Sequence, residues 1–167
     1  NTWKENYKAA NRISIIQEKS SLAENLNIAD NIFVLRPGFR QWMIRTKILN
    51  RQMEPFLEDI GMDIPLNKDV EKLSTFERII VELLRAVIMG YHLIVLDEVG
   101  ALVSDDELKK LHAIIRHYVK KGFSFLYICS HLEEISSICD RCALFTNGRI
   151  QKILEREELF NDPPVTY

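Results

Sequence analysis

Two neighbouring acids, Asp97 and Glu98, directly follow the apolar run from Leu93 to Leu96. An apolar run of this length predicts a buried strand, so both acids are expected at its carboxyl end. In open α/β sheets, ligands bind beyond the carboxyl ends of the strands. A carboxylate there can hold magnesium, and a neighbouring carboxylate can orient or deprotonate an attacking water. The pair predicts a metal-assisted hydrolytic site, and the alternative is two solvated acids at a strand end.

A well-marked helix precedes this strand. Ser74 and Glu77 form an S-x-x-E capping box at its expected start, and Gly90 stands at its expected end. Its buried face is predicted from apolar residues at three-to-four spacing. These are Phe76, Ile79, Ile80, Leu83, Leu84 and Val87.

Two more capping boxes follow the acids, Ser104 with Glu107 and Ser130 with Glu133. They predict two further helices, with a second buried strand, residues 123–129, between them. Strand and helix therefore alternate after residue 91, which predicts a parallel sheet.

The two ends of the pattern are simpler. Residues 12–17 predict a short strand, because three isoleucines supply β-branched bulk. Residues 24–72 predict a small helical unit, with a helix from Phe39 to Ile60 after a break at Pro37-Gly38. Asn147-Gly148 between two apolar runs predicts a C-terminal β-hairpin.

Composition limits the class of protein. The 167 residues are 47% hydrophobic and 28% charged with a net charge of −2, which is typical of one globular domain. This charge gives no indication of a nucleic-acid partner. Cys139 and Cys142 lack a second ligand pair, so a zinc site is not expected. No apolar run approaches the roughly 18 residues that span a membrane, and the first residues do not form a secretory signal.

Several segments in the right order resemble the ATP-binding subunits of ABC transporters. Residues 73–98 resemble the stretch from the signature motif, usually LSGGQ, to the Walker B acids, at the family's usual spacing without a gap. Residues 126–150 resemble the region of the switch histidine, and residues 15–34 resemble the Q-loop region. The resemblance covers about residues 12–155 and is strongest to importers of simple sugars.

The resemblance implies a role for each site residue. Glu98 would be the catalytic general base, and His131 the switch histidine near the γ-phosphate. Gln17 would be the Q-loop glutamine and would reach Mg²⁺, which Asp97 would hold. Ser74 would contact the γ-phosphate of a nucleotide held by an opposing subunit.

The resemblance also implies a fold. It is α/β: a partial P-loop-NTPase-like domain with a parallel sheet flanked by helices, a small helical subdomain and a C-terminal β-hairpin. Residues 1–167 would form one domain, with residues 24–72 as the helical subdomain and residues 73–155 as the signature and Walker B core.

The chain lacks the family's phosphate-binding loop, since none of its six glycines lies in the pattern G-x-x-x-x-G-K-[ST]. Backbone N–H groups and the lysine of that loop supply the main grip on the phosphates. In the family the loop precedes the Q-loop, so it would lie upstream of Asn1 or would never have been present. Loss of a central strand would expose apolar sheet edge, which predicts self-association or a rearranged sheet.

The signature motif is altered too. Thr75 and Phe76 replace its two glycines and Glu77 replaces its glutamine. We expect Phe76 to fill the space that a γ-phosphate needs, and Glu77 to add a repelling charge. The alternative is that Phe76 turns into the core and leaves Ser74 free.

Two further departures lie near the acids. Aligned without a gap, Ser130 takes the place of the switch histidine, and His131 is shifted by one. Val99-Gly100 replaces the usual Pro-Thr after the acids.

These features predict an ATP-binding subunit, or a fragment of one, of an ABC transporter for sugar import. The full protein would bind ATP and Mg²⁺, dock on a transmembrane permease and pair with a second nucleotide-binding domain. It would be cytoplasmic, peripheral at the inner face of the membrane, while this chain alone would be inactive. One alternative is a degenerate, non-catalytic scaffold or regulatory module, and another is an unrelated domain that uses Asp97 as a phosphoacceptor.

Overall fold

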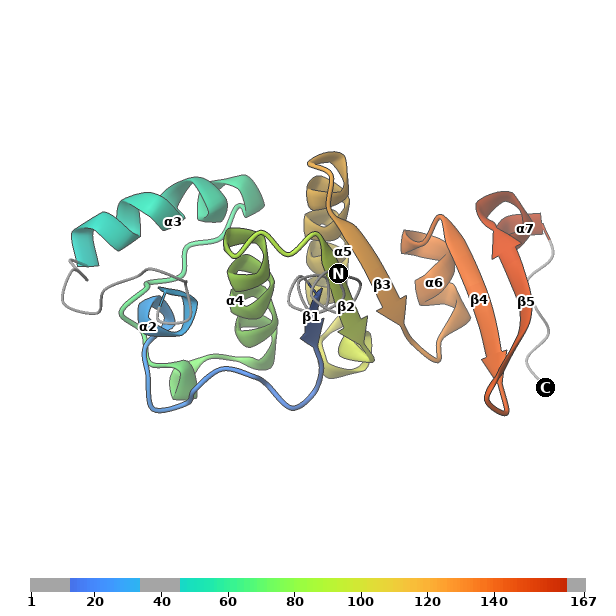
Figure 1. Ribbon diagram of the computed structural model, residues 1–167, viewed down its shortest axis with the longest axis horizontal. Coiled ribbons are helices and arrows are strands. Elements are labelled where there is room, and N and C mark those ends of the chain that lie inside the picture. The colour runs from blue at the N-terminus through green and yellow to red at the C-terminus, as the bar shows by residue number, and fades with distance from the viewer. Residues whose placement is uncertain (1–12, 34–45, 162–167) are drawn as a thin grey trace, which may run out of the picture.

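The computed structural model describes residues 13–33 and 46–161 of the chain (Figure 1). Their helices and strands alternate through much of the sequence. In order, the elements are β1 (Ile13–Ile16), α2 (Ile28–Phe33), α3 (Thr46–Ile60), η2 (Val70–Lys72), α4 (Thr75–Ile88), β2 (Leu93–Asp97), η3 (Val99–Leu102), α5 (Asp105–Lys120), β3 (Ser124–Ile128), α6 (Leu132–Ile138), β4 (Arg141–Thr146), β5 (Arg149–Glu155) and α7 (Arg156–Asn161).

The first three strands form the predicted parallel sheet, in the order β1-β2-β3. Ile16 pairs with Leu96, and Leu96 pairs with Tyr127, so these three residues form one row across the sheet. α4 leads into β2, and α5 connects β2 to β3. This arrangement confirms the α/β fold and puts the three carboxyl ends at one edge.

The predicted hairpin is also present, as an antiparallel pair β4-β5 outside the parallel sheet. Asn147 and Gly148 at its turn have φ of 51° and 76°. A two-residue hairpin turn of type I′ needs positive φ at both positions, and Asn-Gly is the pair that tolerates it best. Figure 1 shows the hairpin and α7 at one end of the molecule, with α6 between the hairpin and β3.

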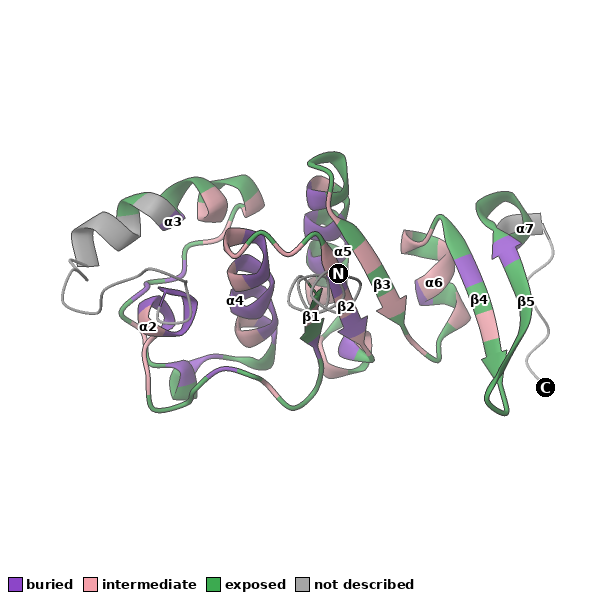
Figure 2. Cartoon of the chain, viewed as in Figure 1, coloured by how far each residue is buried: buried purple, intermediate pink, exposed green. Residues whose placement is uncertain are grey.

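The main core lies between the sheet and the helices. Ile16, Ile94 and Leu96 are each fully buried and cluster with the apolar stripe of α4 and with α5 (Figure 2). The predicted stripe of α4 is confirmed, because all six of its residues are buried. Tyr118 of α5 is also buried, at 1% exposure.

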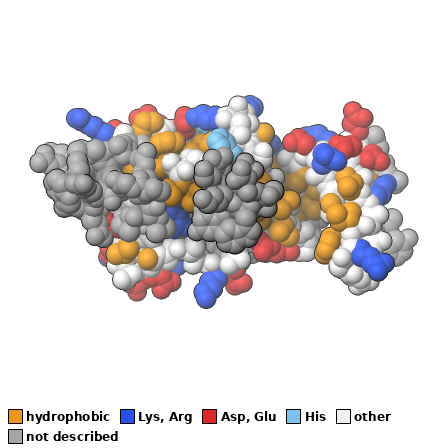
Figure 3. All heavy atoms as spheres, viewed as in Figure 1, with side chains coloured by type: hydrophobic (Ala, Val, Ile, Leu, Met, Phe, Trp, Pro, Cys, Tyr) orange, Lys and Arg blue, Asp and Glu red, His pale blue; other side chains and the backbone are white. Residues whose placement is uncertain are grey.

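The opposite face of the sheet is open. Ile15 and Leu126 are 56% and 53% exposed, while Val95 between them is half-buried. The buried strand predicted at residues 93–96 is thus fully buried on one face, where the helices of the core pack, and half-buried on the other. Figure 3 shows hydrophobic side chains at the surface over β3 and over the hairpin.

Two of the three predicted capping boxes are formed, at Ser74 and at Ser104. The third, Ser130 with Glu133, is wrong: His131 is the N-cap of α6, and its side chain makes no capping bond. Because α6 starts one residue later than the motif requires, the Ser130 hydroxyl does not cap it and instead donates to Glu98.

The helical unit after β1 is confirmed in its described parts, α2 and α3. The predicted break at Pro37-Gly38 and the first residues of the predicted helix, 39–45, lie outside the described residues. None of the helices described is long and apolar enough to cross a membrane.

Candidate functional site

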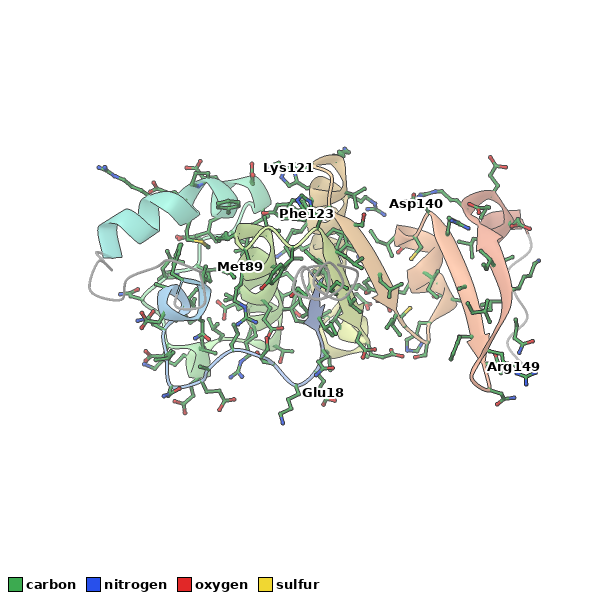
Figure 4. All side chains as sticks on the ribbon, in the orientation of Figure 1. Glu18, Met89, Lys121, Phe123, Asp140 and Arg149 are labelled. Atoms are coloured by element: carbon green, nitrogen blue, oxygen red, sulfur yellow. The ribbon has the colours of Figure 1, made fainter. Side chains whose placement is uncertain are left out.

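The candidate site lies at the carboxyl edge of the parallel sheet. Gln17 follows the last residue of β1, and Asp97 is the last residue of β2. Asp97 pairs with Ile128 at the end of β3. The register therefore brings Gln17 and Asp97 to the same edge, as the sequence predicts, and Glu18 lies just past the end of β1 (Figure 4).

Glu98 is held by its backbone in an uncommon conformation. Its φ is 52°, in the left-handed region that a residue with a side chain seldom adopts. Its amide donates a hydrogen bond to the carbonyl of Ile128 at 2.9 Å. Such backbone outliers cost of order 1–3 kcal/mol and persist where the surrounding structure fixes them. The chain therefore turns sharply at this acid, and the exposed carboxylate stands beyond the sheet edge.

The side chain that reaches Glu98 comes from Ser130. The Ser130 hydroxyl donates to Glu98 Oε2 at 3.4 Å, whereas His131 is exposed at the start of α6. This contact matches the gap-free alignment, in which Ser130 takes the position of the switch histidine. The structure thus places Gln17, Asp97 and Glu98 at one edge of the sheet, with Ser130 in contact with Glu98.

The start of α4 corrects the expectation for the altered signature. Phe76 is 6% exposed and lies in the core, so it does not fill the space in front of the helix. Ser74 is exposed; its hydroxyl accepts from the amide of Glu77 at 3.1 Å, and its own amide donates to Glu77 Oε2 at 2.8 Å. The inward alternative is what the structure shows, although capping occupies the Ser74 hydroxyl.

Glu77 does not present an uncompensated charge. The Lys68 ammonium lies 2.9 Å and 3.0 Å from its two carboxylate oxygens. Burial acts to raise the pKa of Glu77, but the hydrogen bonds from Lys68 and from the Ser74 amide outweigh it and leave that pKa lowered. The ion pair with Lys68 therefore compensates the charge of Glu77, which was expected to repel a γ-phosphate.

A cavity of about 560 Å³ lies between the segment after β1 and the start of α4. Its walls combine charged and apolar side chains, with Leu102 of η3 closing one side. The lining includes Gln17, Lys19, Thr75 and Arg78. The cavity therefore lies between the predicted Q-loop and the start of α4.

A buried acid fixes this segment to α4, and sequence reasoning missed its role. Glu82 is 2% exposed, and its Oε1 accepts from the Ser20 hydroxyl at 2.8 Å and from the Ser21 amide at 2.5 Å. Arg85 adds hydrogen bonds to the hydroxyl and carbonyl of Ser21. The available signal was an acid within an apolar helix, which is rarely buried without partners.

Asp97 and Gln17 offer oxygen atoms, the donors that Mg²⁺ prefers. Over residues 13–33 and 46–161 there is no group of three or more His, Cys, Asp or Glu residues that could hold a metal alone. Mg²⁺ commonly binds through one or two carboxylates plus water and substrate phosphates, so these residues fit that use.

Sequence comparison finds curated relatives, although no family model matches the chain. The ribose import ATP-binding protein RbsA of Clostridium perfringens strain 13 is 32% identical over 152 residues, 90% of this chain. The protein of the same name from Caldanaerobacter subterraneus subsp. tengcongensis is 30% identical over 151 residues, also 90% of this chain. The chain spans 30% of the length of each of these relatives.

Solved structures share the fold. An ATP-binding cassette of an ABC transporter in its ADP conformation matches with a TM-score of 0.74 and 20% identity, over 94% of this chain and 67% of that one. A dimeric ATP-binding cassette bound to ADP and Pi matches with a TM-score of 0.72 and 12% identity, over 91% of this chain and 67% of that one.

Motif order, strand-edge geometry and both comparisons agree. Asp97-Glu98 ends the middle strand of the sheet, as the resemblance requires, and the fold is that of the ATP-binding cassettes. Over nine-tenths of its length the chain is similar to a part of the ribose import ATP-binding proteins, and it has the fold of the ATP-binding cassettes of ABC transporters.

Proposed function

We propose that this chain is part of the ATP-binding subunit of an ABC transporter that imports a sugar. The observation that carries the proposal is the position of Asp97 and Glu98, beside Gln17 and Ser130, at the carboxyl edge of a cassette-type sheet. The sugar is suggested by the curated relatives, which are named ribose import proteins.

In this proposal each residue acts at the edge of the sheet. Asp97 and Gln17 would hold Mg²⁺, which would neutralise phosphate charge when ATP is bound. Glu98 orients or deprotonates the attacking water, and Ser130 holds that carboxylate in place. His131 stays a candidate switch residue, and Ser74 a candidate contact to nucleotide held by a second cassette.

The partners are a transmembrane permease and a second nucleotide-binding domain, which would hold the subunit at the inner face of the membrane. The permease surface we propose is the helical subdomain, residues 24–72, with the neighbouring cavity. That cavity is walled by the Q-loop segment, so a partner seated there would also contact the residues that follow β1.

Docking on a permease can be tested with membrane vesicles. The chain is mixed with vesicles that carry the permease subunit of a ribose importer, and the sedimented fraction is compared with that on permease-free vesicles. Lys19→Glu reverses an exposed charge on the cavity wall and should lower the specific fraction several-fold. Lys110→Glu, an exposed residue of α5, is the matched control and should have no effect. Equal sedimentation on both kinds of vesicle would refute the docking proposal.

A second candidate function is a non-catalytic scaffold with the same partners. It is favoured by the altered signature motif, in which Thr75 and Phe76 replace the two glycines. The two candidates differ in a mixture with a complete ribose import ATP-binding protein. If this chain contributes to hydrolysis, Ser74→Ala should lower the ATP turnover of the mixture and Thr75→Ala should not. If it is a scaffold, neither change alters turnover.

A further inference from the structure

A buried acid in α6 has no part in the roles given above. Glu134 is 9% exposed, and its Oε1 accepts a hydrogen bond from the Tyr127 hydroxyl of β3. Its backbone carbonyl accepts from the Ser137 hydroxyl at 2.7 Å. A carboxyl group is costly to bury unless it is hydrogen-bonded, so the structure holds Glu134 at a defined place.

That place is the one a side chain at position 100 would occupy. An ideal Cβ added to Gly100 would meet Glu134 Oε1 first and would lie 2.5 Å from its Cδ and 2.6 Å from its Oε2, closer than real Cβ contacts. Gly100 is not among the glycines with positive φ, so its backbone suits other residues as well. A side chain at position 100 would therefore meet the Glu134 carboxyl group, which would have to move.

Gly100 belongs to the turn that carries the candidate general base. Glu98 in its left-handed conformation is the N-cap of η3, which runs from Val99 to Leu102. The amide of Glu98 is bonded to the carbonyl of Ile128, the residue after Tyr127. The turn is therefore bonded to β3 at Ile128, and the Glu134 carboxyl group, bonded to the preceding Tyr127, lies beside the turn at Gly100.

The direction of the tyrosine bond is well defined. Burial, and then the hydrogen bond to Glu134, raise the pKa of Tyr127, so the phenol keeps its proton and donates. His112 supports the pair from α5: its ring meets that of Tyr127 edge-on at 5.7 Å, and its Nδ1 lies 3.2 Å from the Ser137 hydroxyl. β3 thus reaches the carboxyl group directly, and α5 packs against the tyrosine that holds it.

We propose that Glu134 is a positioning residue for Glu98. Held by Tyr127, its carboxyl group occupies the space left by Gly100 and fixes the turn at residues 98–102 against α6. The functional meaning of this device rests on the proposed role of Glu98, but its structural test does not need nucleotide.

The test follows the backbone amide of Glu98 by NMR in the whole chain. Gly100→Ala adds one methyl group, which must displace the Glu134 carboxyl; hydrogen exchange at Glu98 should speed up about tenfold, as for loss of a hydrogen bond, and its resonance should shift. Glu134→Ala frees the space, so adding Gly100→Ala to it should cause no further change. Glu134→Gln keeps an acceptor oxygen for Tyr127, so the Glu98 amide should be better protected from exchange than in Glu134→Ala. Glu133→Ala, at the exposed neighbouring acid, should not change exchange at Glu98.

Two results would overturn the proposal. One is a Glu98 amide that Gly100→Ala leaves unchanged, even with a lower Tm, which would mean only a structural role. The other is additive effects of the changes at positions 100 and 134. Should Gly100→Ala fail to fold, Tyr127→Phe removes the bond without adding volume, and unchanged exchange at Glu98 in that variant would equally refute the idea.

Discussion

At the scale of single residues, the acids at the strand end are left without a cation. Among the described residues, the ion pairs do not include Asp97 or Glu98, and the hydroxyl of Ser130 is the side-chain partner of Glu98. Elsewhere in the described part of the chain, Glu77 pairs with Lys68 and Asp59 pairs with Lys121. Two unpaired carboxylates at a sheet edge suit a divalent cation, which supports the proposed Mg²⁺ site.

His112 gives a prediction about pH. Burial, and then the nearby Arg116 guanidinium, lower the pKa of His112, so the imidazole is neutral in the folded chain. The unfolded chain takes up a proton near the ordinary value of 6.5, and the folded chain takes it up only at a lower pH. The free energy of unfolding should therefore be full above that pH and decrease as pH falls below it.

Urea unfolding at several pH values around 6.5 measures this slope. His112→Gln should reduce it, because the variant has no proton to take up at this position. His92→Gln, at an exposed histidine, is the control and should keep it. A slope that is the same in the wild type and in His112→Gln would contradict the prediction.

The sequence predicted residue types better than contacts. Asp97 and Glu98 were placed correctly because an apolar run fixes where a strand ends. The partner of Glu98 was not predictable in the same way, since a one-residue change in the start of α6 decides whether residue 130 or 131 faces it. The position of the Phe76 side chain was ambiguous for a similar reason. At a helix start a side chain can point away from the helix end or into the core, and Phe76 packs in the core.

At the scale of elements, α4 is the best specified helix. Its capping box is complete, with both reciprocal bonds between Ser74 and Glu77. A further bond from Lys68 ties the box to the segment before the helix. Local sequence and tertiary contacts agree here, which explains why its bounds were predicted closely.

Ser74→Ala tests the cap. Loss of an N-cap oxygen should lower the free energy of unfolding by about 1 kcal/mol, and the Tm by about 2–4 °C for a chain of this size. Thr75→Ala at the next, exposed position is the matched control and should change the Tm little. Equal effects of the two substitutions in thermal unfolding would show that the box does not stabilise α4.

The same box predicts acid sensitivity. The lowered pKa of Glu77 means that its carboxylate contributes stability above its ordinary value of 4.5, and that this contribution is lost as pH falls. Since the pair is partly exposed, its size should be at most about 1 kcal/mol and should shrink in high salt. Glu77→Gln should flatten the pH dependence between pH 4.5 and lower values in urea unfolding, whereas Glu133→Gln, an exposed acid, should not.

At the scale of the whole molecule, the apolar surface of the sheet is the outstanding feature. Ile15, Leu126 and Ile128 are exposed on the parallel sheet, and Phe145 is 68% exposed on the hairpin. The sequence predicts exposed apolar residues at an edge of the sheet, whereas the structure exposes them on one of its faces. The sequence could not predict this, because an apolar run looks the same whether one face or both are covered.

Such a surface predicts self-association of the chain in solution. Sedimentation velocity over a concentration series should show a mean mass that rises with concentration. Leu126→Lys should reduce this rise, because it places a charge among the exposed apolar residues of the sheet. Val119→Lys, on α5 and 43% exposed, is the control and should leave association unchanged. A monodisperse monomer at all concentrations would contradict the expectation.

The measurement that most directly tests the account is equilibrium binding of Mg-ATP to this chain, with Asp97→Asn as control. In the proposed function this chain carries the carboxylate edge of an ATP site, and its 167 residues contain none of the loop that grips phosphates. We therefore predict no saturable binding at millimolar nucleotide, for the wild type or the variant. Clear binding by the wild type that Asp97→Asn abolishes would contradict this prediction, because the strand-end acids would then suffice with donors from elsewhere in the chain.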